Sequence, residues 1–306
     1  MLHVEILREL TLEAPSSPGR KAHFSAASGV VRHGRFMYVI GDDELNLAVF
    51  SMEGDRPGRL LRLFEGELAV EESERQAGKP DLEALTTLPP FARCPHGALL
   101  ALGSGTGDTR ERGFVWALDE EGGLIGFPRV VDLSDLYRFL RRHVAEMNIE
   151  GVAVTGERLA LFQRGNSEMG QNIVAHLDLA EVVESLSSDF RIDPSELLDI
   201  HAYDLGRSGG VDLAFTDGDS LPDGSLVFTA AAEPGGDDPD GSPAGSIVGI
   251  LDPSGRLELS EPLEDKTIKL EGVDAVVAGE DVGVLLVSDA DDPDVASPLL
   301  SATLRR

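Results

Sequence analysis

The chain has 306 residues, enough for two average domains or for one large all-β wheel with a full core. Aliphatic and aromatic residues make up 42% of it, a share typical of globular proteins that argues against wholesale disorder. Its 55 acidic residues outnumber the 26 basic ones and give a net charge of −29, which disfavours nucleic acid and anionic membranes as partners.

Cysteine content and the N-terminal residues bear on where the protein works. Cys94 is the only cysteine, so we expect neither an internal disulfide nor a thiolate metal cluster. The N-terminal residues lack a basic segment followed by an apolar one, and no apolar run approaches the ~20 residues that a membrane span needs. We therefore expect a cytoplasmic protein.

A short segment recurs five times along the chain, and four of its copies carry an acidic residue. Successive copies are 55 to 67 residues apart, and the step from the fifth copy around to the first has a similar length. Such a period predicts one domain, residues 1–306, folded as a five-bladed β-propeller, with a six-bladed ring as the alternative. We call the five repeated positions the anchors: Ser28, Glu83, Glu150, Asp212 and Glu271.

Each anchor is followed by apolar segments of strand length, separated by polar, acidic or glycine-rich loops. The first four units contain enough segments for four strands each. The fifth unit has no candidate for a fourth strand after residue 304, whereas residues 3–10 alternate apolar and polar side chains. We expect this N-terminal segment to complete the fifth blade and close the ring.

Two segments have helical rather than strand character. Residues 134–147 form one predicted insertion between blades, with Leu136, Phe139, Leu140, Val144 and Met147 on one helical face and Ser134 as a cap. A shorter helix is expected at residues 180–186. The insertion either covers part of one face of the wheel or only packs against it.

The acidic anchors are candidate metal ligands. In a propeller the innermost strands line the central channel, so Glu83, Glu150, Asp212 and Glu271 are expected to converge at its mouth. Converging carboxylates repel one another and must be protonated, paired with basic groups or bridged by a cation. Oxygen-only ligands suit Ca²⁺, Mg²⁺ or Mn²⁺. In the alternative, each acid caps backbone amides or meets a basic neighbour, and the repeat serves folding alone.

The loops on the same face contribute candidate ligand-binding residues. Arg164 ends an apolar segment that points at the mouth, where its guanidinium either grips an anion or pairs with Glu150 or Glu83. The candidates for ligand binding are Arg164, Asn166, Asp42, Asp43 and Lys269.

Several familiar catalytic patterns are absent from the sequence. The seven histidines include no pair at the spacing of a helical zinc site, and His176 and His201 are expected to be half-buried or exposed strand residues. No Gly-x-Ser-x-Gly elbow and no phosphate-cradling loop occurs. A hydrolase of the common Ser-His-Asp kind is therefore unsupported.

Three motifs resemble those of bacterial propellers of the phytase-esterase-like group, most closely an uncharacterised branch. They are the Glu-Gly-Val anchor at Glu150, the Arg164-Gly165-Asn166 run, and Asp-x-x-x-Leu-Pro-Asp-Gly-x-Leu-x-Phe-Thr-Ala from Asp217. The resemblance implies a propeller fold, divalent-cation dependence and hydrolysis of phosphate or carboxylic esters. The Glu-Gly anchor is also similar to the metal ligand of six-bladed gluconolactonase-type propellers, which would match Glu150 or Glu83. This chain departs from the gluconolactonase-type motif, because no proline follows Glu-Gly here.

Two functions remain open at this point. The chain is either a propeller that binds a small molecule, a cation or a protein at the channel face, or a divalent-cation-dependent hydrolase of a small anionic ester, lactone or phosphoester. No complete catalytic set is visible, which favours binding and leaves open whether the protein is an enzyme.

Overall fold

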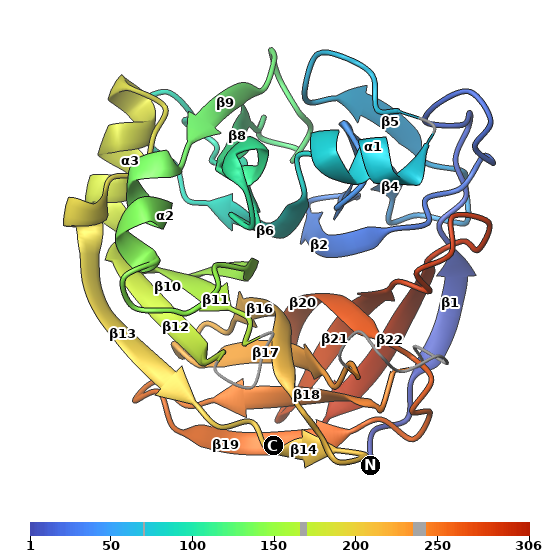
Figure 1. Ribbon diagram of the computed structural model, residues 1–306, viewed down its shortest axis with the longest axis vertical. Helices are drawn as coiled ribbons and strands as arrows, with labels where there is room; N and C mark the ends of the chain where they lie inside the picture. Colours follow the sequence, from blue (N-terminus) through green and yellow to red (C-terminus); the bar gives the residue numbers. More distant parts are fainter. Residues whose placement is uncertain (70, 166–169, 235–242) are drawn as a thin grey trace.

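The apolar segments after each anchor form antiparallel strands, and these pair into five four-stranded sheets around a central axis (Figure 1). The computed structural model describes residues 1–69, 71–165, 170–234 and 243–306. The five-bladed propeller is confirmed, rather than the six-bladed alternative. Within the described ranges, no helix is long and apolar enough to cross a membrane.

The blades follow one another in chain order, each running from an innermost to an outermost strand. Blade 1 contains β2 (Ala27–His33), β3 (Phe36–Gly41), β4 (Asn46–Ser51) and β5 (Arg59–Arg62). Blade 2 contains β6 (Leu82–Leu88), β7 (Ala98–Gly103), β8 (Arg112–Ala117) and β9 (Arg129–Asp132). Blade 3 contains β10 (Ile149–Thr155), β11 (Arg158–Gln163), β12 (Asn172–Asp178) and β13 (Leu197–Tyr203). Blade 4 contains β16 (Ala214–Ser220), β17 (Leu226–Ala231), β18 (Ser246–Leu251) and β19 (Leu257–Pro262).

Blade 5 joins the two ends of the chain. It contains β20 (Leu270–Ala278), β21 (Asp281–Ser288), β22 (Pro298–Leu304) and, as its outermost strand, β1 (Glu5–Glu9). β1 runs antiparallel to β22, with Glu5 opposite Ser301 and Glu9 opposite Pro298. The predicted closure of the ring by the N-terminal strand is confirmed, and β22 has no unpaired edge.

The described helices lie in the connections between strands. They are α1 (Glu72–Gly78), α2 (Ser134–Leu140) and α3 (Leu179–Ser188), with short 3₁₀ turns at Asp108–Arg110 and Pro194–Glu196. α3 confirms the shorter predicted helix, and the Asp178 carboxylate accepts from the backbone N–H groups of Ala180 and Glu181 at its start.

The predicted insertion at residues 134–147 is helical only in its first half. α2 ends at Leu140 and buries Leu136, Tyr137 and Leu140, whereas Met147 lies beyond the helix and is buried in the same apolar cluster. The Tyr137 hydroxyl donates to the carbonyl of Gly103 at 2.6 Å, which ties the helix to β7. Ser134 is not a side-chain cap; its N–H instead donates to Asp132 at 3.0 Å.

Buried carboxylates join neighbouring blades by accepting from the backbone of the next inner strand. Asp217 accepts from the N–H of Val273 at 2.8 Å, and Asp219 accepts from that of Ala275 at 2.7 Å. Asp274 in turn accepts from the N–H of Arg32 at 2.6 Å. These bonds link blade 4 to blade 5 and blade 5 to blade 1. They also give hydrogen-bond partners to backbone N–H groups of β20 and β2, which are the inner edge strands of their sheets.

Aromatic side chains fill the interface between blades 3 and 4. The rings of Phe162, Phe215 and Phe228 meet edge to face, with centroids 5.3 Å and 5.1 Å apart along the series. Gly218 allows this packing, because a Cβ atom there would lie 2.2 Å from a ring carbon of Phe162.

We predict that Gly218→Ala destabilises the protein by about 1–3 kcal/mol, the usual cost of overpacking a filled core. Urea unfolding followed by tryptophan fluorescence or circular dichroism measures this. Gly107→Ala is the matched control, because Gly107 has extended backbone (φ −166°) and open space where its Cβ would lie. Equal loss of stability in both variants would contradict the packing argument.

Candidate functional site: the acidic mouth of the channel

Each inner strand has a bulge near its start, at the anchor position. In all five blades the pairing between the inner strand and its neighbour shifts register at the same place, which leaves one side chain out of the ladder. A bulge of this kind re-aims the side chain of the extra residue. The residues at this position are Ser28, Glu83, Glu150, Thr216 and Glu271.

The anchor of blade 4 is therefore Thr216, and the prediction of Asp212 for this position is corrected. Asp212 belongs to a two-stranded hairpin, β14 (Arg207–Ser208) and β15 (Val211–Asp212), that precedes the inner strand. Its side chain is 70% exposed and accepts from Arg207 Nε at 2.6 Å. The hairpin sequence resembles the apolar pattern of an inner strand. The predicted anchor of blade 4 therefore lies four residues too early in the chain.

The three anchor carboxylates differ in what neutralises them. Glu150 accepts from Asn148 Nδ2 at 2.5 Å and lies 3.4 Å from Arg164 Nη1, and Glu271 lies 3.0 Å from Lys269 Nζ. Glu83 makes no hydrogen bond or ion pair with any residue in the described ranges. Burial, followed by repulsion from Glu150, raises the pKa of Glu83 well above its usual value.

The pKa of Glu150 is also perturbed. Burial raises it to about 8; the charge of Arg164 opposes that rise and the charge of Glu271 adds to it. Glu150 therefore carries a proton over much of the neutral pH range, although a guanidinium lies beside it.

The carboxylate of Glu233, from a loop, pairs with basic side chains from two different blades. Glu233 pairs with Arg164 and lies 2.8 Å from Lys269 Nζ, which also lies 3.1 Å from Asp291. Burial opposes ionisation of Glu233, but the charges of Arg164 and Lys269 outweigh it and lower its pKa below the usual value. Arg164 thus adopts the structural role considered for it, as the ion-pair partner of an anchor acid.

A second group of carboxylates lies beside Glu83. Oxygen atoms of Asp42, Asp81 and Glu83 all lie within 4.8 Å of one another, a spacing that could hold a metal ion. Lys79 Nζ contacts Asp42 and lies 2.7 Å from Asp81, whose other oxygen is 2.9 Å from Arg110 Nη1. The ammonium group of Lys79 therefore supplies the positive charge between these carboxylates.

Of the remaining predicted residues, Asp43 pairs with Arg20 and lies 3.9 Å from Arg75 of α1. One of its oxygens, Oδ1, is buried without a hydrogen-bond partner among the described residues. Asn166 lies outside the described residues. The structure thus brings Asp42, Arg164, Lys269 and three of the four predicted metal ligands into one connected group.

Sequence reasoning missed Asp81, which precedes its anchor by two residues. Asn148 and Lys269 hold the same position relative to Glu150 and Glu271 and contact them directly. A polar residue two positions before the anchor thus recurs in three blades, which makes this spacing a usable signal.

We define the mouth cluster as these ion-paired or electrostatically coupled side chains. Among the described residues, its nine acidic members exceed its six basic members by three, so full ionisation of these groups would leave excess negative charge at the mouth. The acidic members are Asp42, Asp43, Asp81, Glu83, Glu150, Glu233, Glu271, Asp289 and Asp291. The basic members are Arg20, Arg75, Lys79, Arg110, Arg164 and Lys269.

A family model matches residues 23–304, which include the inner strands of all five blades. The chain belongs to the family of unknown function DUF6929. A search of curated proteins gives no significant match. The naming of the group as phytase-esterase-like is not confirmed by these comparisons.

Solved structures that cover most of the chain include several enzymes, all of low similarity. A luciferin-regenerating enzyme is 11% identical over 100% of this chain and 98% of its own, with a TM-score of 0.44. A gluconolactonase from Xanthomonas campestris is 12% identical over 91% and 72%, with a TM-score of 0.43. A mannose phosphorylase from Leishmania mexicana is 13% identical over 98% and 89%, with a TM-score of 0.46. Similarity at this level carries no functional argument.

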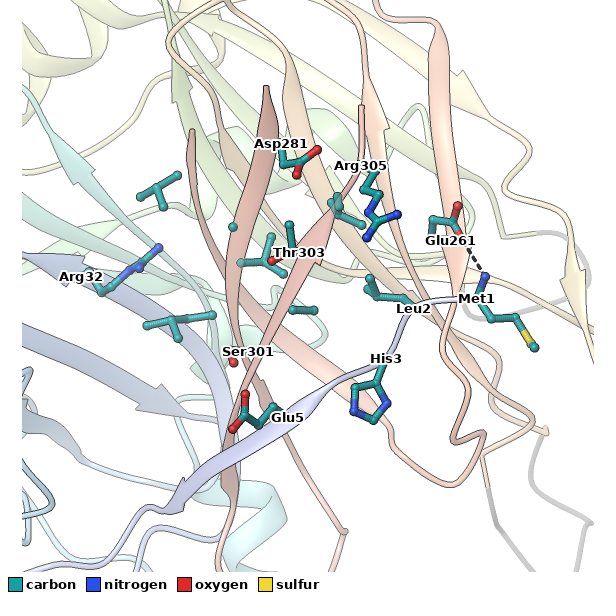
Figure 2. A pocket seen from close by; sticks show the side chains of 16 residues that line it. Met1, Leu2, His3, Glu5, Arg32, Glu261, Asp281, Ser301, Thr303 and Arg305 are labelled. Carbon is teal, nitrogen blue, oxygen red and sulfur yellow. Dashed lines mark hydrogen bonds and ion pairs between the residues drawn. The ribbon is translucent and has the colours of Figure 1, made fainter. Parts of the chain in front are cut away.

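A large surface pocket lies away from the mouth cluster. It has a volume of about 770 Å³ and lies where the N-terminal segment crosses blade 5 (Figure 2). Met1, His3, Thr303 and Arg305 are among its lining residues, and the terminal amine of Met1 lies 2.9 Å from Glu261. None of its lining residues belongs to the mouth cluster.

We predict a pH dependence of stability that comes from Glu150. The unfolded chain releases this proton near the usual pKa of 4.5, whereas the folded chain holds it up to about 8. The contribution is fully present below 4.5, and the free energy of unfolding falls as the pH rises from 4.5 to 8. Denaturant unfolding at several pH values should show a shallower fall in Glu150→Gln.

Asp212→Asn is the control for this measurement, because Asp212 is exposed and lies outside the mouth cluster. It should keep the slope of the parent protein. Some slope should also remain in Glu150→Gln, because burial raises the pKa of Asp289 to about 8 as well. An unchanged slope in Glu150→Gln would show that Glu150 is ionised across this range.

Proposed function

We propose that the mouth cluster binds a divalent cation, Ca²⁺, Mg²⁺ or Mn²⁺, and that the protein is a binding propeller for a small molecule or a protein at this face. The observation that supports this most is Glu83. Its carboxylate has no partner among the described residues, although the oxygens of Asp42 and Asp81 lie within 4.8 Å. A bound cation would neutralise the excess negative charge of these carboxylates, which without a cation is reduced by protonation.

The donor set fits such an ion. Glu83, Asp42 and Asp81 offer only oxygen atoms, which Ca²⁺, Mg²⁺ and Mn²⁺ prefer. Lys79 Nζ already contacts Asp42 and Asp81, so a metal ion and this ammonium group would compete for the same oxygens. A bound cation would therefore release Lys79 from at least one carboxylate and make it available to an anionic ligand.

The opposite side of the mouth supplies groups for the ligand itself. Arg164 and Lys269 are both held by Glu233, and each also contacts an anchor carboxylate. This arrangement fixes two positive charges beside the channel before any ligand arrives, which reduces the entropy lost on binding an anion.

We predict that the chelator-treated protein binds Ca²⁺, Mg²⁺ or Mn²⁺ in isothermal titration calorimetry and that Glu83→Gln abolishes binding. The affinity should increase with pH, because the raised pKa of Glu83 makes protons compete with the ion. Lys79→Met should bind the ion more tightly than the parent, since it removes the competing ammonium group.

Asp212→Asn is again the matched control, and its affinity should equal that of the parent protein. The proposal fails if none of the three ions binds the parent, or if Glu83→Gln binds as tightly as Asp212→Asn.

A divalent-cation-dependent hydrolase of a small anionic ester, lactone or phosphoester is the second candidate. Glu150 favours it, because a carboxyl group with a pKa of about 8 holds a proton that it can donate to a leaving group near neutral pH. Arg164 lies 3.4 Å from this carboxyl group and would orient the negative charge of a substrate.

We predict, if this second candidate holds, that Glu150→Gln lowers kcat toward p-nitrophenyl esters or phosphates by about 10²–10⁴-fold, the usual contribution of general acid catalysis. Circular dichroism and cation titration of the variant show whether fold and ion binding persist. Equal turnover by the parent, Glu150→Gln and Arg164→Ala would exclude hydrolysis at this site.

A further inference from the structure

A second group of potential ligands lies on the outer half of blade 3, away from the mouth cluster. His176 on β12 is directly opposite Asp199 on β13, and His201 follows Asp199 by two residues on the same strand. Opposite residues of an antiparallel pair, and residues two apart on one strand, share a face of the sheet. Strand register therefore brings together two imidazoles and one carboxylate that are far apart in sequence.

The three side chains converge on one oxygen atom. His176 Nδ1 lies 2.7 Å from Asp199 Oδ1, and His201 Nε2 lies 3.2 Å from the same oxygen. One atom from each residue lies within 4.8 Å of the other two. The two imidazole rings meet at a centroid distance of 5.8 Å in an edge-to-face arrangement.

The surroundings of the group leave one side open. The His176 side chain is 11% exposed, whereas those of Asp199 and His201 are 32% and 56% exposed. Arg158 Nη1 lies 2.6 Å from the other oxygen of Asp199, Oδ2. Arg158 thus fixes the carboxylate by one oxygen and leaves Oδ1 directed at the two imidazoles, as an outer-shell partner does in metal sites.

We propose that His176, Asp199 and His201 form a binding site for one Zn²⁺ ion or a similar divalent transition-metal ion. Two imidazole nitrogens and one carboxylate oxygen are a donor set that zinc accepts, with a remaining position for water. Ca²⁺ and Mg²⁺ prefer oxygen ligands alone, so this site selects a different class of ion from the mouth cluster.

The ion would fasten the outermost strand of blade 3. β13 is mostly half-buried or exposed and pairs only with β12 among the described strands. An ion bound to His176 on β12 and to Asp199 and His201 on β13 would cross-link the two strands. Because the site exists only when these strands are paired, binding would stabilise the folded chain.

The test uses the full chain after treatment with a chelator. Calorimetric titration with ZnCl₂ should show one site per chain, and zinc should raise the melting temperature. His201→Ala and Asp199→Asn should each weaken zinc binding by at least about tenfold, because loss even of an outer-shell partner usually costs 10–100-fold. His201 is exposed, so its substitution should leave the fold intact.

Two control variants distinguish this site from other zinc ligands. His96→Ala removes an exposed histidine outside the group, and Glu83→Gln removes a carboxylate of the mouth cluster. Both should bind zinc as the parent does. With Co²⁺ as a spectroscopic probe, the visible absorption of the bound ion should persist in these controls and disappear in His201→Ala.

The proposal is overturned if the parent protein shows no saturable zinc binding, which would leave a hydrogen-bonded His-Asp-His group only. It is equally overturned if His201→Ala binds zinc as tightly as His96→Ala. Loss of Ca²⁺, Mg²⁺ or Mn²⁺ binding in Glu83→Gln has no bearing on it, because the two sites share no residue.

Discussion

The convergence of five inner strands on one axis is the constraint on which the rest of the structure depends (Figure 1). It places the bulged side chain of every blade near its equivalents, and three of the five are carboxylates. Buried like charges at close range are unfavourable, and lysine and arginine side chains surround these carboxylates. All six basic residues of the mouth cluster lie in connections that lead into an inner strand or follow a second strand.

The same constraint divides the acidic residues of the chain into two kinds. Asp217, Asp219 and Asp274 lie deeper in the blade interfaces and accept hydrogen bonds from backbone amides, so their role is architectural. Burial raises the pKa of carboxyl groups of both kinds, but Glu83 and Glu150 lie among other carboxylates, and repulsion from these neighbours adds to the rise. An acidic composition alone does not separate these two kinds, because the distinction comes from what faces each carboxylate.

The repeat was readable from the sequence because each blade must bury the same kind of strands around the same axis. Five units, the closing N-terminal strand and all three acidic anchors of the structure could be predicted for that reason. Asp212 could not be distinguished from Thr216, since a short hairpin imitates the pattern of the inner strand that follows it. Ser28 already showed that a hydroxyl residue can occupy the anchor position. The His176, Asp199 and His201 group was also invisible, because its members meet through the register of two strands rather than through a short spacing.

The pairing of β1 with β22 has a consequence for how the chain folds. The residues that pair are separated by nearly the whole sequence, and contacts of such range slow folding because a large loop must close first. During synthesis at ~5–20 residues per second, β1 emerges early and has no partner until β22 follows. β1 carries three charged residues, Glu5, Arg8 and Glu9, beside the exposed Ile6 and Leu7, so this segment is not wholly apolar while it has no partner. The strand that closes the wheel is thus also the strand whose partner lies farthest from it in the sequence.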